Sequence, residues 1–163
     1  MSTLKQRLHF AIQYRETGKH EEARQLLLEL HSEFPEDSQV NYQCAWIHDL
    51  LGLEREAIPF YDKAIENGLS GDDLKSALLG KGSTHRAIGE YQKSIDTFQH
   101  ALTLFPGCHE FKVFLAMALH NIQEHSGAME LLLNSLADTS ADEGILRYRR
   151  AIKFYADKLE QTW

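Results

Sequence analysis

The residues with the greatest capacity for chemistry in this chain are its nine histidines and two cysteines. Histidine is the commonest metal ligand and general acid or base near neutral pH, and a cysteine thiolate is a nucleophile or a metal ligand. His120 and His125 stand five residues apart, so they do not share one helical face as an i, i+4 metal-binding pair does. His48 precedes a turn and is predicted to pack against a neighbouring helix, and Cys44, beside Ala45, is predicted to be a small core residue.

Sequence motifs for catalysis or metal binding are missing from this chain. It contains no His-Glu-x-x-His, Cys-x-x-Cys, phosphate-binding loop or Gly-x-Ser-x-Gly pattern. Two cysteines are also too few for a disulfide framework. We therefore expect no cofactor, no bound metal and no catalytic residue, and we expect that the protein is not an enzyme. A metal-binding or catalytic role is kept only as a residual alternative.

The elements that would position any site are marked by turn residues at a regular spacing. Gly18, Gly52 and Gly89 are followed at the same phase by Gln123, with intervals of 34, 37 and 34 residues. A period of this length predicts a stack of helical hairpins, each of which buries its apolar face against its neighbours. The three additional residues of the second interval are predicted to lengthen the loop at residues 67–73.

Small side chains recur on both sides of each turn. One stands seven residues before the turn and another five residues after it, which would let two antiparallel helices approach closely. A large apolar side chain follows nine residues after the turn, and a Phe-Pro pair ends two of the units. The small, small and large positions of the four units are Ala11, Ala23 and Leu27; Ala45, Ala57 and Tyr61; Gly82, Ser94 and Phe98; and Ala116, Ala128 and Leu132.

This residue pattern resembles that of the tetratricopeptide repeat, a helix-turn-helix unit with glycine in the turn and proline at its end. The stretch from Gly89 to Pro106 is a close match, and Gly18 to Pro35 and Gly52 to Ala64 match well. The fourth unit departs from the pattern at Gln123 and lacks the closing proline. The resemblance implies an all-α fold, a right-handed α-solenoid of four such repeats. Their expected boundaries are about residues 4–37, 38–74, 75–108 and 109–142.

The pattern changes after Ser140 to a single helix without a partner. Tyr148, Ile152, Tyr155 and Leu159 recur at i, i+4, i+7 and i+11 and form one apolar stripe. We expect residues 143–163 to be a C-terminal capping helix that gives the stack a solvated end.

Charge is distributed unevenly along the chain. The net charge is −7, with +2 in residues 143–163 and −9 in the first 142 residues. An acidic body argues against a nucleic-acid ligand, which would require a basic stripe. No apolar run approaches the roughly 18 residues of a membrane span, and the N-terminus has no signal-peptide core. We therefore expect no membrane insertion and a cytoplasmic location.

The resemblance also indicates a binding surface, because in tetratricopeptide stacks the first helix of each repeat lines the concave face. Most of the side chains at the matching positions are apolar, with Trp46 as the expected central anchor. Gly80 and Ser83 would leave room for a bulky side chain of a ligand. The candidate groove residues are Leu8, Ile12, Arg15, Tyr42, Gln43, Trp46, Asp49, Leu79, Arg86, Val113, Met117 and His120.

One well-known class of partner is excluded by this resemblance. Members of the family that bind the acidic C-terminus of heat-shock chaperones use a clamp of Lys, Asn, Asn, Lys and Arg. None of these side chains is retained, and leucine or isoleucine cannot donate a hydrogen bond to a carboxylate. The matching positions in this chain are Leu8, Ile12, Gln43, Ser76 and Gly80.

The sequence therefore predicts a non-enzymatic module that binds an apolar or amphipathic segment of a protein partner in this groove. Its polar rim, expected to set specificity, is Lys5, Gln43, Asp49, Arg86 and His120. Two alternatives remain open. Two copies of the chain could occupy each other's grooves as a homodimer, or the last helix could fold back over the groove.

Overall fold

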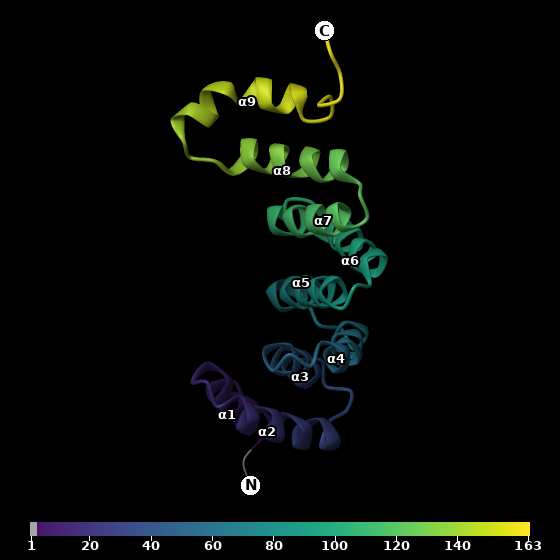
Figure 1. Ribbon diagram of the computed structural model, residues 1–163. Helices are drawn as coiled ribbons and strands as arrows, with labels where there is room; N and C mark the ends of the chain where they lie inside the picture. The colour runs from purple at the N-terminus through teal and green to yellow at the C-terminus, as the bar shows by residue number, and fades with distance from the viewer. Residues whose placement is uncertain (1–2) are drawn as a thin grey trace. The chain divides into compact units, whose positions relative to one another are not determined.

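The structure is a computed structural model that describes residues 3–163, and these residues form nine α-helices and no β-strand. The predicted all-α class is therefore confirmed for this part of the chain. In chain order the helices are α1 (Leu4–Glu16), α2 (His20–Glu33), α3 (Ser38–Leu50), α4 (Glu54–Glu66), α5 (Gly71–Ala87), α6 (Tyr91–Leu104), α7 (His109–Asn121), α8 (His125–Thr139) and α9 (Glu143–Tyr155) (Figure 1).

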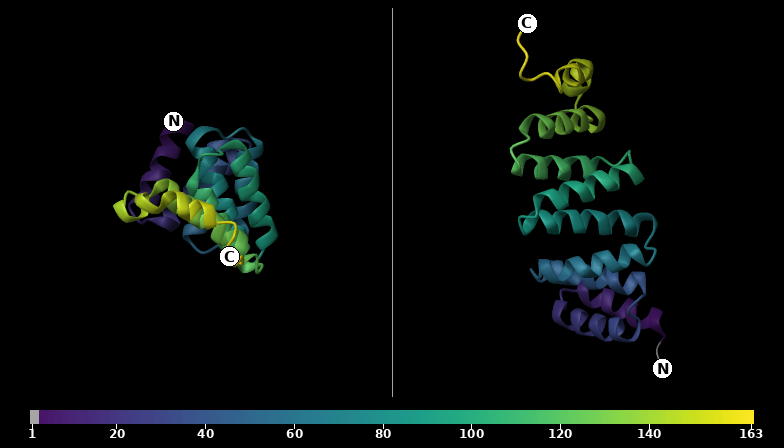
Figure 2. Two further views of the ribbon diagram at one scale, coloured as in Figure 1. Left: turned by 90° about the horizontal axis from the view of Figure 1, so that it is seen from above. Right: turned by 90° about the vertical axis from the view of Figure 1, so that its right-hand side faces the viewer.

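The helices group into two compact units. The first unit ends at Gly89 and contains α1 to α5, and the second begins at Glu90 and contains α6 to α9. Within each unit, consecutive helices pack side by side (Figure 2). Helix α3 contacts α1, α2, α4 and α5, so it is the central element of the first unit.

The residue predicted to end each first helix has a left-handed backbone conformation. This conformation lets the next amide reach the carbonyl group five residues earlier, as the N–H of Glu124 does when it donates to the oxygen of Leu119 at 3.0 Å. Gln123 is the one non-glycine residue with positive φ within residues 3–163. The φ angles are +78° at Gly18, +71° at Gly52, +82° at Gly89 and +68° at Gln123.

The prediction of a longer loop before α5 is wrong. Helix α5 begins at Gly71 and is 17 residues long, whereas α3 has 13 residues, so the additional residues lie in the helix rather than in the loop. Asp72 and Asp73 occupy the first turn of α5, where carboxylates interact favourably with the positive end of the helix dipole.

Small residues let the helices of the first unit pack closely, as predicted. Ala11, Ala23, Ala45 and Ala57 are all fully buried, and Leu27 lies with Ala11 and Ala23 in the core between α1, α2 and α3. A larger side chain at any of these alanines would push two helices apart, because the interior is already close-packed.

His48 and Cys44 are core residues, which confirms both predictions. Nδ1 of the His48 ring lies 2.7 Å from the carbonyl oxygen of Cys44, and both side chains are buried. Burial raises the pKa of the Cys44 thiol to about 12, so the thiol stays protonated and unreactive at neutral pH. Cys44 is a packing residue rather than a chemical one.

Helix α9 leaves much of its predicted apolar stripe exposed. Tyr148 and Tyr155 are 62% and 48% exposed, and within the second unit α9 contacts only α8. Its fixed contacts to α8 include Arg149 and Lys153, which both approach Asp138 Oδ1, at 3.5 and 2.6 Å. The outer face of α9 is therefore apolar as well as charged.

Candidate functional site

Trp46 on α3 is held in place by Arg15 on α1. The guanidinium carbon of Arg15 lies 3.6 Å from the centre of the indole ring, a cation–π contact. Arg15 also donates a hydrogen bond from Nη1 to Oε1 of Gln43, and both residues are buried. Burial lowers the pKa of Arg15, while Glu16, with a carboxylate oxygen 3.7 Å from Nη2, opposes that effect. Gln43 therefore holds Arg15 against one face of the tryptophan, and Gln43 does not lie on the exposed rim where the sequence placed it.

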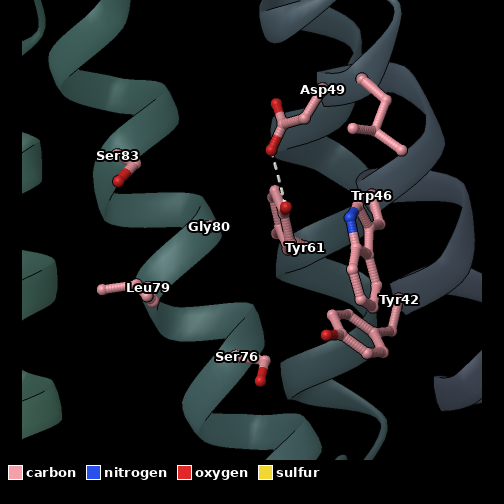
Figure 3. Close-up of a pocket in the computed structure, with 9 residues that line it drawn as sticks. Tyr42, Trp46, Asp49, Tyr61, Ser76, Leu79, Gly80 and Ser83 are labelled. Carbon is pink, nitrogen blue, oxygen red and sulfur yellow. Dashed lines mark hydrogen bonds between the residues drawn. The ribbon is translucent and has the colours of Figure 1, made fainter. Parts of the chain in front are cut away.

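The other side of Trp46 faces a pocket of about 380 Å³ between α3, α4 and α5 (Figure 3). Trp46 remains 38% exposed, so part of its indole ring is accessible to a ligand. Aromatic and small side chains make up most of the wall. We call this hollow the Trp46 pocket, and its lining residues are Tyr42, Trp46, Asp49, Leu50, Tyr61, Ser76, Leu79, Gly80 and Ser83.

Asp49 supplies the single carboxylate of the Trp46 pocket. Its Oδ2 accepts a hydrogen bond from the Tyr61 hydroxyl at 2.6 Å, and the Thr84 hydroxyl lies 2.9 Å from each carboxylate oxygen. Burial raises the pKa of Asp49, and the two hydroxyl groups act in the opposite direction. The carboxylate is therefore held rigidly by neutral donors at the wall of the pocket.

Gly80 gives the pocket its depth and leaves room for Tyr61. A Cβ atom at Gly80 would overlap the Tyr61 hydroxyl oxygen and lie 2.6 Å from its Cζ. Figure 3 shows Gly80 between Ser76 and Ser83 on α5, opposite Tyr61 and Asp49. Glycine normally destabilises a helix interior, so the close approach of the tyrosine explains why it stands here.

The structure brings four of the predicted groove residues into one site: Tyr42, Trp46, Asp49 and Leu79 all line the Trp46 pocket. Leu8 packs instead against the core between α1, α2 and α3, and Ile12 is half-buried. Arg86 is half-buried near the end of α5. Val113, Met117 and His120 belong to α7 in the second unit, where Met117 and His120 are exposed.

His120 and His125 lie closer together than their spacing suggested. They face each other across the turn between α7 and α8, with 3.0 Å between their Nδ1 atoms. Oε1 of Gln123 lies 3.1 Å from Nε2 of His125 on its other side. Within residues 3–163, no group of three or more His, Cys, Asp or Glu side chains has a geometry that could hold a metal ion.

Sequence reasoning missed Tyr61, which it placed among the packing residues of the second helix. A tyrosine in a buried apolar position needs an acceptor for its hydroxyl group, whereas the equivalent Leu27 and Phe98 need none. The hydroxyl group, which needs an acceptor, and the glycine inside a helix at position 80 were the available signals, and neither identifies the residue that it meets.

None of the helices formed by residues 3–163 combines the length and the apolar character needed to cross a membrane.

Comparison with known proteins agrees with this architecture. A family model described as tetratrico peptide repeat matches residues 38–159, and a second, described as tetratricopeptide repeat, matches residues 7–37. A search of curated proteins by sequence finds no match.

Several solved structures have a similar fold at low sequence identity. MamA of AMB-1 superposes with a TM-score of 0.74 at 20% identity, over 88% of this chain and 78% of MamA. A tetratricopeptide repeat protein from Parabacteroides merdae gives 0.76 at 14% identity, over 93% of this chain and 58% of that protein. PilF from Pseudomonas aeruginosa gives 0.69 at 15% identity, over 93% and 68% of the two chains. The nine described helices, the left-handed turn residues and the family models lead to one conclusion: this chain is an α-solenoid protein that belongs to the tetratricopeptide repeat family.

Proposed function

We propose that this protein is a protein-interaction module that binds an apolar or amphipathic segment of a partner protein in the Trp46 pocket. Membership of the tetratricopeptide repeat family supports a non-enzymatic interaction scaffold. The observation that carries the more specific proposal is the pocket itself, a preformed hollow of about 380 Å³ with a fixed and partly exposed tryptophan in its wall.

Two physical features favour a partner's side chain as the occupant. Tryptophan and tyrosine dominate the energetic centres of protein interfaces, because they bury a large area with few rotatable bonds. Arg15 and Gln43 already fix the orientation of Trp46, so little side-chain entropy is lost on binding. Leu50 and Leu79 extend the apolar wall on either side and would contact the residues that flank the anchor.

The test uses peptides selected from a random displayed library against the Trp163→Phe protein, which retains Trp46 as its one tryptophan. Trp46→Ala is expected to weaken the selected peptides by about 2 kcal/mol, roughly thirtyfold in Kd, while circular dichroism stays unchanged. Tyr14→Ala is the matched control, because Tyr14 is 37% exposed on α1 outside the pocket. Peptides that bind the Trp46→Ala protein with unchanged affinity, or unfolding of that variant, would count against the proposal.

A homo-oligomer is the second candidate, and a different surface favours it. Helix α8 exposes Met129, Leu132 and Leu136 at i, i+3 and i+7, and the helix that packs against it, α9, exposes Tyr148 and Tyr155. Leu132 shares its phase with Leu27 and Phe98, which are almost fully buried. Light scattering across a hundredfold concentration range distinguishes the candidates, because the mean mass rises with concentration only if copies of the chain associate.

A further inference from the structure

We propose that the Trp46 pocket is specific for a cationic side chain, the guanidinium or ammonium group of an arginine or lysine in the partner, with Asp49 as its counter-ion. This inference rests on the proposed function and names the chemistry of the residue that enters the pocket.

The first observation is that Asp49 forms no salt bridge within residues 3–163, although the neighbouring His48 has a small electrostatic effect on it. Its carboxylate accepts hydrogen bonds from Tyr61 and Thr84, which are both neutral, and no Lys, Arg or His within residues 3–163 forms an ion pair with it. A carboxylate taken partly out of water by burial gains more from an added cation than a fully hydrated one does. The raised pKa of Asp49, caused first by burial, agrees with this account.

The second observation is that the charge next to the pocket is also negative. A smaller hollow of about 250 Å³ shares Asp49 and Ser83 with the Trp46 pocket and is lined by Glu54 as well. Glu54 is among the groups that raise the pKa of Asp49, so it adds to the negative potential at this point. An anionic ligand would be repelled here, whereas a cation would be attracted by both carboxylates.

The third observation is the nature of the other walls. The rings of Tyr42 and Trp46 lie 5.7 Å apart and tilted, and both border the pocket. Aromatic faces attract ammonium and guanidinium groups, and they also cover the aliphatic part of a lysine or arginine side chain. Ser83 stands on α5 across from Asp49, whereas Ser76 stands at the other end of the pocket, across from Tyr42 (Figure 3). The hydroxyl group of a serine can accept an N–H bond.

The one cation already at this site does not fill the role. Arg15 stacks on Trp46, but it donates to Gln43 and lies 3.7 Å from Glu16, which offsets its charge. It does not line the pocket. A partner's cation would therefore meet the carboxylate of Asp49, which forms no salt bridge with Arg15.

The experiment follows the indole N–H signal of Trp46 by NMR in the Trp163→Phe protein, with four small probes of one chain length. n-Butylguanidinium and n-butylammonium are the cations, n-butanol is the neutral probe and butyrate is the anion. We expect both cations to shift the signal saturably, and the two other probes to bind at least tenfold more weakly. Equal binding of n-butanol, or preferred binding of butyrate, would overturn the inference without any variant.

Asp49→Asn tests the counter-ion directly. The amide oxygen of asparagine can still accept from Tyr61 and Thr84, so the fold is expected to persist while the affinity for n-butylguanidinium falls at least tenfold. Asp96→Asn is the matched control, because Asp96 is exposed on α6, outside the pocket, and its replacement removes the same charge. An Asp49→Asn protein that stays folded and binds the cation as tightly as the parent would overturn the inference.

Selected peptides separate failure of this inference from failure of the proposed function. If peptides depend on Trp46 but contain no essential arginine or lysine, and tolerate Asp49→Asn, the pocket binds partners through apolar contact and the cation inference is wrong. If the peptides bind the Trp46→Ala protein with unchanged affinity while n-butylguanidinium still binds through Asp49, the cation inference is supported and the proposed function is wrong.

Discussion

Replacement of Gly80 by alanine should destabilise the protein, although Gly80 lies inside helix α5. In an exposed helix interior the same change stabilises by up to about 1 kcal/mol, because glycine has the greater conformational freedom when unfolded. At Gly80, however, the added Cβ would overlap the hydroxyl oxygen of Tyr61 and lie 2.6 Å from its Cζ. Carbon atoms in contact prefer about 3.5–4.0 Å, so the phenol ring must move by roughly 1 Å.

The cost of this movement follows from the surroundings of Tyr61. The ring is only 3% exposed, and its hydroxyl group donates to Asp49 at 2.6 Å. Overpacking costs about 1–3 kcal/mol, and loss of a hydrogen bond to a carboxylate costs about 1.5–3 kcal/mol. After subtracting about 1 kcal/mol of improved helix propensity, we expect a net loss of about 1.5–5 kcal/mol. For a chain of this length each kcal/mol lowers Tm by about 2–4 °C.

Urea unfolding followed by circular dichroism measures this change. Gly127→Ala is the matched control, because a Cβ there meets nothing closer than Leu119 Cδ1 at 3.8 Å, so that variant should be as stable as the parent or more so. Tyr61→Leu removes the crowded end of the ring, and in that background Gly80→Ala should no longer destabilise. A Gly80→Ala protein at least as stable as the parent would refute the reasoning, as would an equal loss in the Tyr61→Leu background.

Two further predictions concern single side chains. Gln123→Gly should stabilise the protein by about 0.5–1 kcal/mol, since φ is +68° at Gln123 and glycine adopts this conformation without strain. The control is Gln99→Gly, at an exposed interior position of α6, which should destabilise the protein by about 1 kcal/mol. Urea midpoints of the two variants that move in the same direction would contradict this account. Burial raises the pKa of Asp49, so the folded state binds its proton more tightly than the unfolded state, and this contribution to stability grows as the pH falls. The parent should therefore gain stability relative to Asp49→Asn between pH 7 and pH 4, and a difference independent of pH would contradict it.

Much of the fold could be predicted because its rules are local. Glycine at 18, 52 and 89 indicated turns, and the phase identified Gln123 as the fourth turn residue; the structure gives all four a left-handed conformation. The prediction failed at the start of α5, because acidic residues after Gly71 suit a loop and the first turn of a helix equally well.

The candidate site was predictable only on one helix. Tyr42, Trp46 and Asp49 are spaced at i, i+4 and i+7 on α3, so the sequence alone predicts that they share one face of this helix. Tyr61 was assigned to the core because its neighbours could not be known from its own helix. Nothing in the sequence shows that its hydroxyl group, Gly80 on the next helix and Asp49 on the previous one meet at one point.

The sequence by itself determined the helices, the turns that end them, the close-packed alanines and the membership of the repeat family, because each depends on residues within about one repeat of one another. Only the tertiary structure decided which side chains form the pocket, that Arg15 stacks on Trp46 across 31 positions of the chain, and that Asp49 accepts its hydrogen bonds from Tyr61 and Thr84. The physical reason is that these properties depend on the distance between helices and their relative rotation. Differences of about 1 Å in that packing decide between a hydrogen bond and a clash, and a residue pattern along one chain does not encode such differences.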